Sequence, residues 1–233
     1  MRVREVKGEM RKITFTLVMG VLLAFSDSSF GIGTGTVWVG QSSTTGQVVR
    51  PDSYEQAVAT LRLSRFTFDN YGAGTVLNNV DLGGVILSAN AGGASLTIDT
   101  SRKAGAEPAS PPNVLYVDEA PSNPTKLTFL LTEPVKSLGF VLGGLGSSSY
   151  LRVYDEQAVL VGSYPIPSAL SVKRRWIAVM ENNCWIKKVE LVPDFKECYA
   201  IDDLELGHAP EPGSLVLFMG MAWMLGGHKR RLL

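Results

Sequence analysis

The chain has 233 residues, and its 22 lysines and arginines balance its 22 aspartates and glutamates. Because the charges balance, nothing in the composition predicts a nucleic acid or an acidic surface as a partner, and we expect no nucleic-acid partner. Its two histidines, His208 and His228, lie outside the predicted folded domain, which excludes Ser-His-Asp catalysis, Cys-His catalysis and His-ligated metal sites there.

Residues 1–26 have the composition of a secretory signal peptide. A short basic segment at residues 10–12 precedes an apolar stretch over residues 13–25, and small side chains stand just before a cut after Ser26. Met10 opens a better signal peptide than Met1 does, because two glutamates dilute the positive charge upstream. We therefore expect export, with residue 10 as an alternative start.

Residues 27–57 are rich in Gly, Ser and Thr and predict a leader, either flexible or with one irregular strand near residues 37–39. Residues 53–60 are compatible with a short helical turn. From residue 58 to 207, apolar residues alternate with polar ones, and Gly, Pro and Asn separate about ten short runs. This pattern predicts an all-β domain, a two-sheet β-sandwich or jelly roll, between a signal-peptide helix and a short hydrophobic C-terminal helix.

The chain has two cysteines, Cys184 and Cys198, and both lie in the exported part. An even number of cysteines in an oxidising compartment favours a disulfide. The alternative is a reduced pair.

The segment 208–233 combines three features in a fixed order. Pro210 and Pro212 flank Glu211 and keep the backbone extended, and residues 214–227 carry no charge. A basic cluster follows, made of Lys229, Arg230 and Arg231. This order resembles the PEP-CTERM sorting signal of Gram-negative bacteria, which implies export, membrane retention and processing by exosortase, a membrane transpeptidase. The alternative is a buried C-terminal helix capped by its basic residues.

A second resemblance concerns the domain itself. Phrases such as Phe68-Asp69-Asn70, Val153-Tyr154-Asp155 and the run 199–204 are similar, in this order, to the β-jelly-roll domain that often precedes PEP-CTERM tails. That domain is related in shape to carbohydrate-binding modules. The resemblance implies a ligand-binding or matrix domain, with exopolysaccharide as a partner and no assured activity.

Nucleotide chemistry has no support in the sequence, which contains neither a GxGxxG motif nor a P-loop. The glutamates are scattered, so no carboxylate pair marks a glycosidase strand. We therefore expect a non-enzymatic protein. The alternatives are a glycan-active hydrolase that uses carboxylates alone, and a purely structural or adhesive module.

The last predicted strand carries an inward-facing carboxylate, Asp202. Strict alternation places Asp202 on the same face as Leu204 and Leu206, and an inward carboxylate has to be paired or bound. By similarity to jelly-roll sugar-binding modules, Asp202 together with Asp69 or Asn70 would hold a structural calcium, for which oxygen ligands are suited. The alternatives are that Asp202 accepts backbone N–H groups at a strand bulge, or pairs with a lysine or arginine.

For carbohydrate binding we expect an exposed aromatic platform. The candidate aromatics are Tyr71, Tyr116, Tyr150, Tyr154, Tyr164, Trp176 and Trp185. Tyr154 lies on the polar side of its strand, and Trp176 and Trp185 flank a predicted hairpin turn, so these three are favoured. The alternative for each of them is packing in the core or at its rim. Residues 173–175 are basic and could attract acidic polysaccharide, or form a solvated strand edge.

Overall fold

The computed structural model describes residues 32–33, 35–40, 48, 50–90, 95–100, 112–118, 124–168 and 174–210. The predicted signal peptide and the sorting tail from Glu211 onward lie outside these residues and stay predictions. Pro210, the last described residue, is exposed. Within the described part of the chain, no helix is long and apolar enough to cross a membrane.

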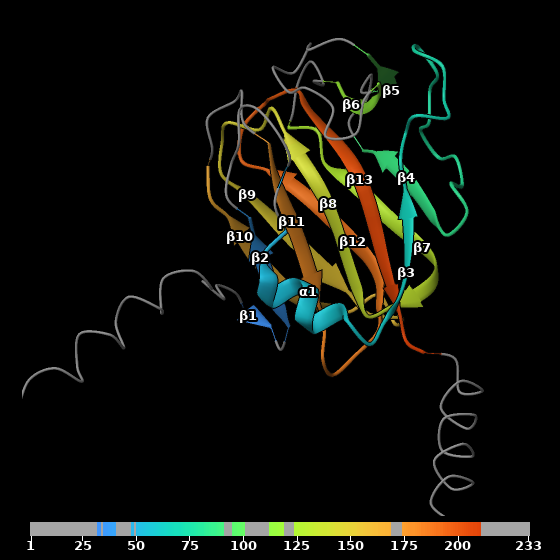
Figure 1. Cartoon of the computed structure of the whole chain (residues 1–233). Helices are drawn as coiled ribbons and strands as arrows, with labels where there is room; N and C mark the ends of the chain where they lie inside the picture. The colour runs from blue at the N-terminus through green and yellow to red at the C-terminus, as the bar shows by residue number, and fades with distance from the viewer. Residues whose placement is uncertain are drawn as a thin grey trace, which may run out of the picture.

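The described residues form two antiparallel sheets packed face to face (Figure 1). One sheet has six strands, in the spatial order β1 (Ile32–Gly33), β10 (Leu160–Ile166), β9 (Ser149–Tyr154), β12 (Ile186–Pro193), β7 (Leu127–Val135) and β4 (Val85–Ala89). The other has seven, in the order β2 (Thr36–Val39), β11 (Arg174–Met180), β8 (Ser137–Gly143), β13 (Tyr199–His208), β6 (Val114–Val117) and β5 (Leu96–Asp99), with β3 (Arg62–Phe66) also paired to β13. The prediction of an all-β, two-sheet sandwich is confirmed.

The main core lies between the sheets and is built from the inward positions of alternating strands. Leu127 and Phe129 of β7, and Leu151 and Val153 of β9, have no exposed surface. The rings of Phe129 and Phe140 of β8 stack across the core with their centroids 5.1 Å apart. Because successive side chains of a strand point to opposite faces, the period of two in the sequence identified these core positions.

A second apolar cluster covers part of the outer surface of the seven-stranded sheet. There Tyr54 of helix α1 (Asp52–Val58) packs between Trp38 of β2 and Trp176 of β11, with ring centroids 5.4 and 5.6 Å from its own. In Figure 1 this helix lies in front of the sheet. Since β2 and α1 come mainly from residues 27–57, that segment contributes structure to the sandwich.

The helix overturns one sequence prediction. Trp176 is only 1% exposed, because α1 covers its indole. The prediction that Trp176 is an exposed ligand-binding aromatic is therefore wrong, and the alternative of core packing holds for this residue.

Next to this cluster, the carboxylate of Glu205 on β13 is fully buried and bonded on both oxygens. Oε1 accepts a hydrogen bond from the Tyr54 hydroxyl at 2.8 Å, and Oε2 accepts from Arg65 Nε at 2.7 Å. Arg50 Nη1 lies 2.8 Å from the same Oε2. Burial, followed by the charge of Glu205, raises the pKa of the Tyr54 hydroxyl well above its ordinary value. These contacts tie α1 and β3 to β13.

The two cysteines are free thiols, so the predicted disulfide is wrong. Cys184 precedes β12 and Cys198 follows it, and this strand of 8 residues spans about 26 Å. A disulfide requires Cα atoms within about 7 Å of each other. Cys184 instead lies by Lys136, whose Nζ donates to its carbonyl at 3.0 Å, while Cys198 lies beside Tyr116 of β6.

Candidate functional site

Asp202, predicted as a calcium ligand, lies in an irregular part of β13. The pairing of β13 with β8 shifts register between Asp202 and Glu205, and Asp203 has a φ of 45°. The backbone N–H of Asp203 donates to Asp202 Oδ1 at 2.9 Å. The buried carboxylate thus accepts a backbone N–H at a strand bulge, which is the alternative that the sequence left open.

The other two predicted calcium ligands lie in the turn after β3. Asp69 Oδ1 accepts the backbone N–H of Asn113 at 3.2 Å, and Asn70 is exposed. The side-chain Nδ2 of Asn113 donates to the carbonyls of Phe68, Asp69 and Tyr71, so an amide already uses the backbone oxygens of this turn. Among the described residues, no three His, Cys, Asp or Glu side chains gather around a common point. Calcium binding stays a prediction.

Of the predicted aromatic residues, Trp185 is half-buried at the turn between β11 and β12. The ammonium of Lys136 lies 4.5 Å from the centroid of its ring. Tyr154, in contrast, lies on the outer surface of the six-stranded sheet. This surface brings together side chains that the sequence analysis did not connect.

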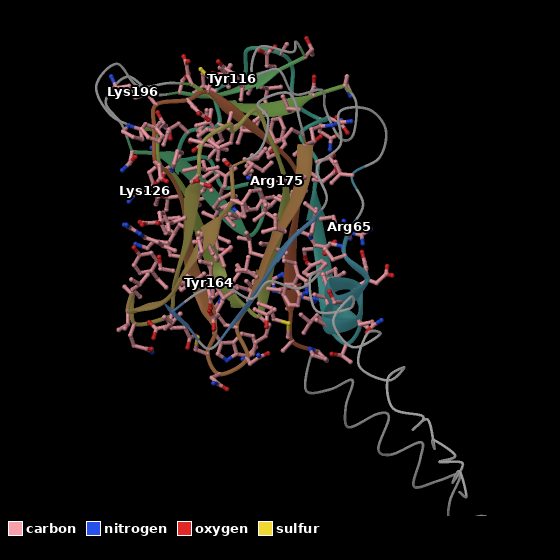
Figure 2. The ribbon with its side chains drawn as sticks, turned by 90° about the vertical axis from the view of Figure 1, so that its left-hand side faces the viewer. Arg65, Tyr116, Lys126, Tyr164, Arg175 and Lys196 are labelled. Carbon is pink, nitrogen blue, oxygen red and sulfur yellow. The ribbon has the colours of Figure 1, made fainter. Side chains whose placement is uncertain are left out.

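We define the open face as eight outward side chains on β9, β12 and the first half of β7, three neighbouring strands of the six-stranded sheet, together with Lys126 just before β7. On β9 these are Tyr150, Arg152 and Tyr154; on β12, Lys188, Glu190 and Val192; on β7, Thr128 and Leu130. Figure 2 shows Lys126 on the left-hand side of the molecule and Arg65, near α1, on the right. The open face and the helix-covered face therefore lie on opposite sides of the sandwich.

The register of the strands fixes the rows of the open face. Arg152 of β9 stands opposite Glu190 of β12, which stands opposite Thr128 of β7. In the next row, Lys188 of β12 stands opposite Tyr154. Tyr150 is 40% exposed and Leu130 is 42% exposed, so the face presents apolar surface as well as charge.

Glu190 organises the centre of the open face through three donors. Its Oε1 accepts from Lys126 Nζ at 2.8 Å and from Lys188 Nζ at 3.2 Å, and its Oε2 accepts from the Tyr154 hydroxyl at 2.8 Å. The ammonium of Lys188 also lies 3.7 Å from the centroid of the Tyr154 ring, a cation–π contact. The side chains at this centre are thus held in place before any ligand arrives.

These contacts shift the pKa values of the site. Burial raises the pKa of Glu190, but hydrogen bonds from Lys126, Tyr154 and Lys188 outweigh it, so the pKa lies below its ordinary value. Burial and the hydrogen bond to Glu190 raise the pKa of Tyr154. At neutral pH the carboxylate is therefore ionised and the tyrosine is neutral.

Tyr150 was one of the candidate aromatics, but sequence reasoning missed Arg152, Lys126, Lys188 and Glu190. A signal was available for β9, because residues 150, 152 and 154 occupy alternate positions of one strand and so share a face. Nothing local in the sequence indicated that β12 and β7 would bring Lys188, Glu190 and Lys126 beside them.

No protein-family model matches the chain, and no curated protein matches it in sequence. Among solved structures, a variant of the family 29 carbohydrate-binding module CBM29-2 matches with 10% identity and a TM-score of 0.41, over 65% of this chain and 99% of that one. Another CBM29-2 variant, complexed with mannohexaose, matches with 12% identity and a TM-score of 0.41, over 64% of this chain and 94% of that one. The enzymatically active domain of tailspike protein 4 of bacteriophage CBA120 matches with 16% identity and a TM-score of 0.35, over 56% of this chain and 21% of that one. Likeness at this level does not define a shared function.

Proposed function

We propose that this chain is an exported surface or extracellular-matrix protein of a Gram-negative bacterium, and that its sandwich binds polysaccharide on the open face. Its tail would be retained in the membrane and processed by exosortase. The proposal for the tail is supported by the sequence alone, through Pro210-Glu211-Pro212, the uncharged run and the basic cluster. The proposal for the sandwich is supported by one observation, the stripe of Tyr150, Arg152 and Tyr154 along β9.

The stripe has the chemistry that recognition of a sugar requires. Tyrosine rings offer flat apolar surfaces against which the C–H groups of a sugar ring pack, while their hydroxyls remain polar. Arg152, Lys126 and Lys188 add N–H donors for sugar oxygens. Because these side chains stand on paired strands rather than on a loop, their spacing is held by the sheet.

The arrangement of the buried carboxylates supports a non-enzymatic role. Glycoside hydrolysis uses two carboxylates facing each other across a cleft. Glu190 accepts three hydrogen bonds within the open face, Glu205 is bonded to Tyr54 and Arg65, and Glu181 accepts a hydrogen bond from Tyr164 at 2.6 Å. These three glutamates serve structural partners.

Binding is tested with the full chain purified in detergent on a glycan array, followed by titration of the polysaccharides that bind. Tyr150→Ala removes an exposed ring and should weaken binding at least about tenfold, the equivalent of about 1.4 kcal/mol. The matched control is Val76→Ala, which removes an exposed apolar side chain paired to β5 of the other sheet and should leave binding unchanged. If Tyr150→Ala bound polysaccharide as tightly as the wild type, the open face would not be the binding site.

The same array tests the calcium proposal when it is run with and without EDTA. Loss of binding or of thermal stability in EDTA, restored by added calcium, would support a site that includes Asp202 and Asp69. Equal binding and equal stability under both conditions would argue against it.

A further inference from the structure

The open face carries an excess of positive charge although the whole chain is neutral. Among the nine side chains of this face, Lys126, Arg152 and Lys188 contribute three cations, and Glu190 contributes the single carboxylate. The exposed Glu133 lies further along β7, at the register shift with β12. The side chains of the open face therefore leave an excess of two positive charges. A neutral sugar gains nothing from such an excess, whereas an anionic ligand does.

The cations are positioned in two different ways. Lys126 and Lys188 are ion-paired with Glu190, and their side chains are 26% and 28% exposed. They therefore hold positive charge in fixed positions at the centre of the face. Arg152 is exposed and stands opposite Glu190, two positions from Tyr150 and two from Tyr154 along β9. Arg152 thus stands between the two tyrosines on the same side of β9.

We propose that the open face selects anionic polysaccharides, of the uronic acid class, over neutral ones. This inference rests on the proposed function. Alternate side chains of β9 are about 7 Å apart, a distance that one sugar ring with its exocyclic carboxylate spans. A sugar ring on Tyr150 or Tyr154 brings its carboxylate to Arg152, whose planar guanidinium donates two parallel hydrogen bonds to a carboxylate. Lys126 and Lys188 add electrostatic attraction for the carboxylates of neighbouring sugar units in the polymer.

The test compares each acidic polymer with a neutral form of the same backbone. The probes are polygalacturonate and alginate, each against its methyl ester, titrated with the full chain in detergent. We expect the acids to bind at least about tenfold more tightly than the esters. The difference should shrink as sodium chloride is raised, because salt screens exposed charges.

Variants of one exposed residue test the role assigned to Arg152. Arg152→Gln should lose most of the preference for the acid, because its affinity for the acid should fall much further than its affinity for the ester. Arg152→Lys keeps the charge without the planar pair of donors. Its preference for the acid should lie between that of the wild type and that of Arg152→Gln. The matched control is Arg62→Gln, which removes an exposed arginine from β3 of the other sheet and should behave as wild type.

The outcomes separate this inference from the function on which it rests. Equal affinities of the wild-type chain for acid and ester would overturn the anionic preference and leave polysaccharide binding standing. An unchanged preference in Arg152→Gln would overturn the assignment of Arg152. If neither these four polymers nor any glycan of the array bound, the proposed function would fail together with the inference.

Discussion

At the scale of single residues, Glu205 and Arg65 show how one ion pair can have unequal partners. The side chain of Glu205 is 0% exposed, whereas that of Arg65 is 60% exposed. A buried carboxylate that loses its partners is costly, and so are buried donors that lose a carboxylate. An exposed arginine that loses its partner returns to water at little cost.

We therefore expect Glu205→Gln to lower the free energy of unfolding by about 3 kcal/mol, because Tyr54 and Arg50 would lose a charged acceptor next to the buried tryptophans. Arg65→Gln should cost less than about 1 kcal/mol, since Arg50 still lies beside the carboxylate. Denaturant unfolding followed by tryptophan fluorescence measures both. Equal losses in the two variants would contradict the asymmetry.

At the scale of elements, the packing of α1 on the seven-stranded sheet depends on a glycine. A Cβ atom built on Gly139 of β8 would overlap the indole ring of Trp176 on β11. The indole is in turn enclosed by Tyr54 and by the guanidinium of Arg50, 4.4 Å from the ring centroid. The ring therefore has little space into which it could move.

Gly139→Ala should consequently destabilise the sandwich by about 1–3 kcal/mol, the usual cost of overpacking. Thermal unfolding of the full chain measures the effect, at about 2–4 °C for each kcal/mol in a domain of this size. Gly72→Ala is the matched control, because the nearest atom to its Cβ is Thr75 Oγ1 at 3.9 Å. A Gly139→Ala variant as stable as the control would mean that α1 packs loosely.

At the scale of the whole molecule, the two proposed roles belong to separate parts of the chain. The open face lies on the sandwich, whereas the predicted sorting motif begins at Pro210, two residues after β13 ends. The sandwich should therefore fold in the same way whether or not the tail is processed.

Replacing Pro210, Glu211 and Pro212 with alanine should leave unprocessed precursor in the membrane of a host that contains exosortase, with an unchanged unfolding transition. Immunoblots of membrane and secreted fractions measure the processing. As a control, alanine at Asn182 and Asn183, two exposed residues of the β11–β12 turn, should leave processing unchanged. Normal processing of the first variant would refute the sorting role.

The alternation of apolar and polar residues predicted much of the fold, but two local features of the sequence led to wrong predictions. Trp176 lies near a predicted turn, which suggested an exposed position, yet α1 from far earlier in the chain covers it. The two cysteines suggested a disulfide by their even number, yet β12 keeps them apart. Both errors have one physical cause, since local sequence does not contain the distance between two segments or the element that packs over them.

The sequence by itself determined which side chains of each strand share a face, because the pleat of a strand imposes a period of two. That period was enough to predict a two-sheet sandwich and to place Tyr154 on a polar face. Only the tertiary structure decided that α1 covers one outer face, and that Tyr150 and Leu130 are exposed on the other. It also brought Lys126, Arg152, Lys188 and Glu190 together, because the pairing of β9, β12 and β7 joins segments that are distant along the chain.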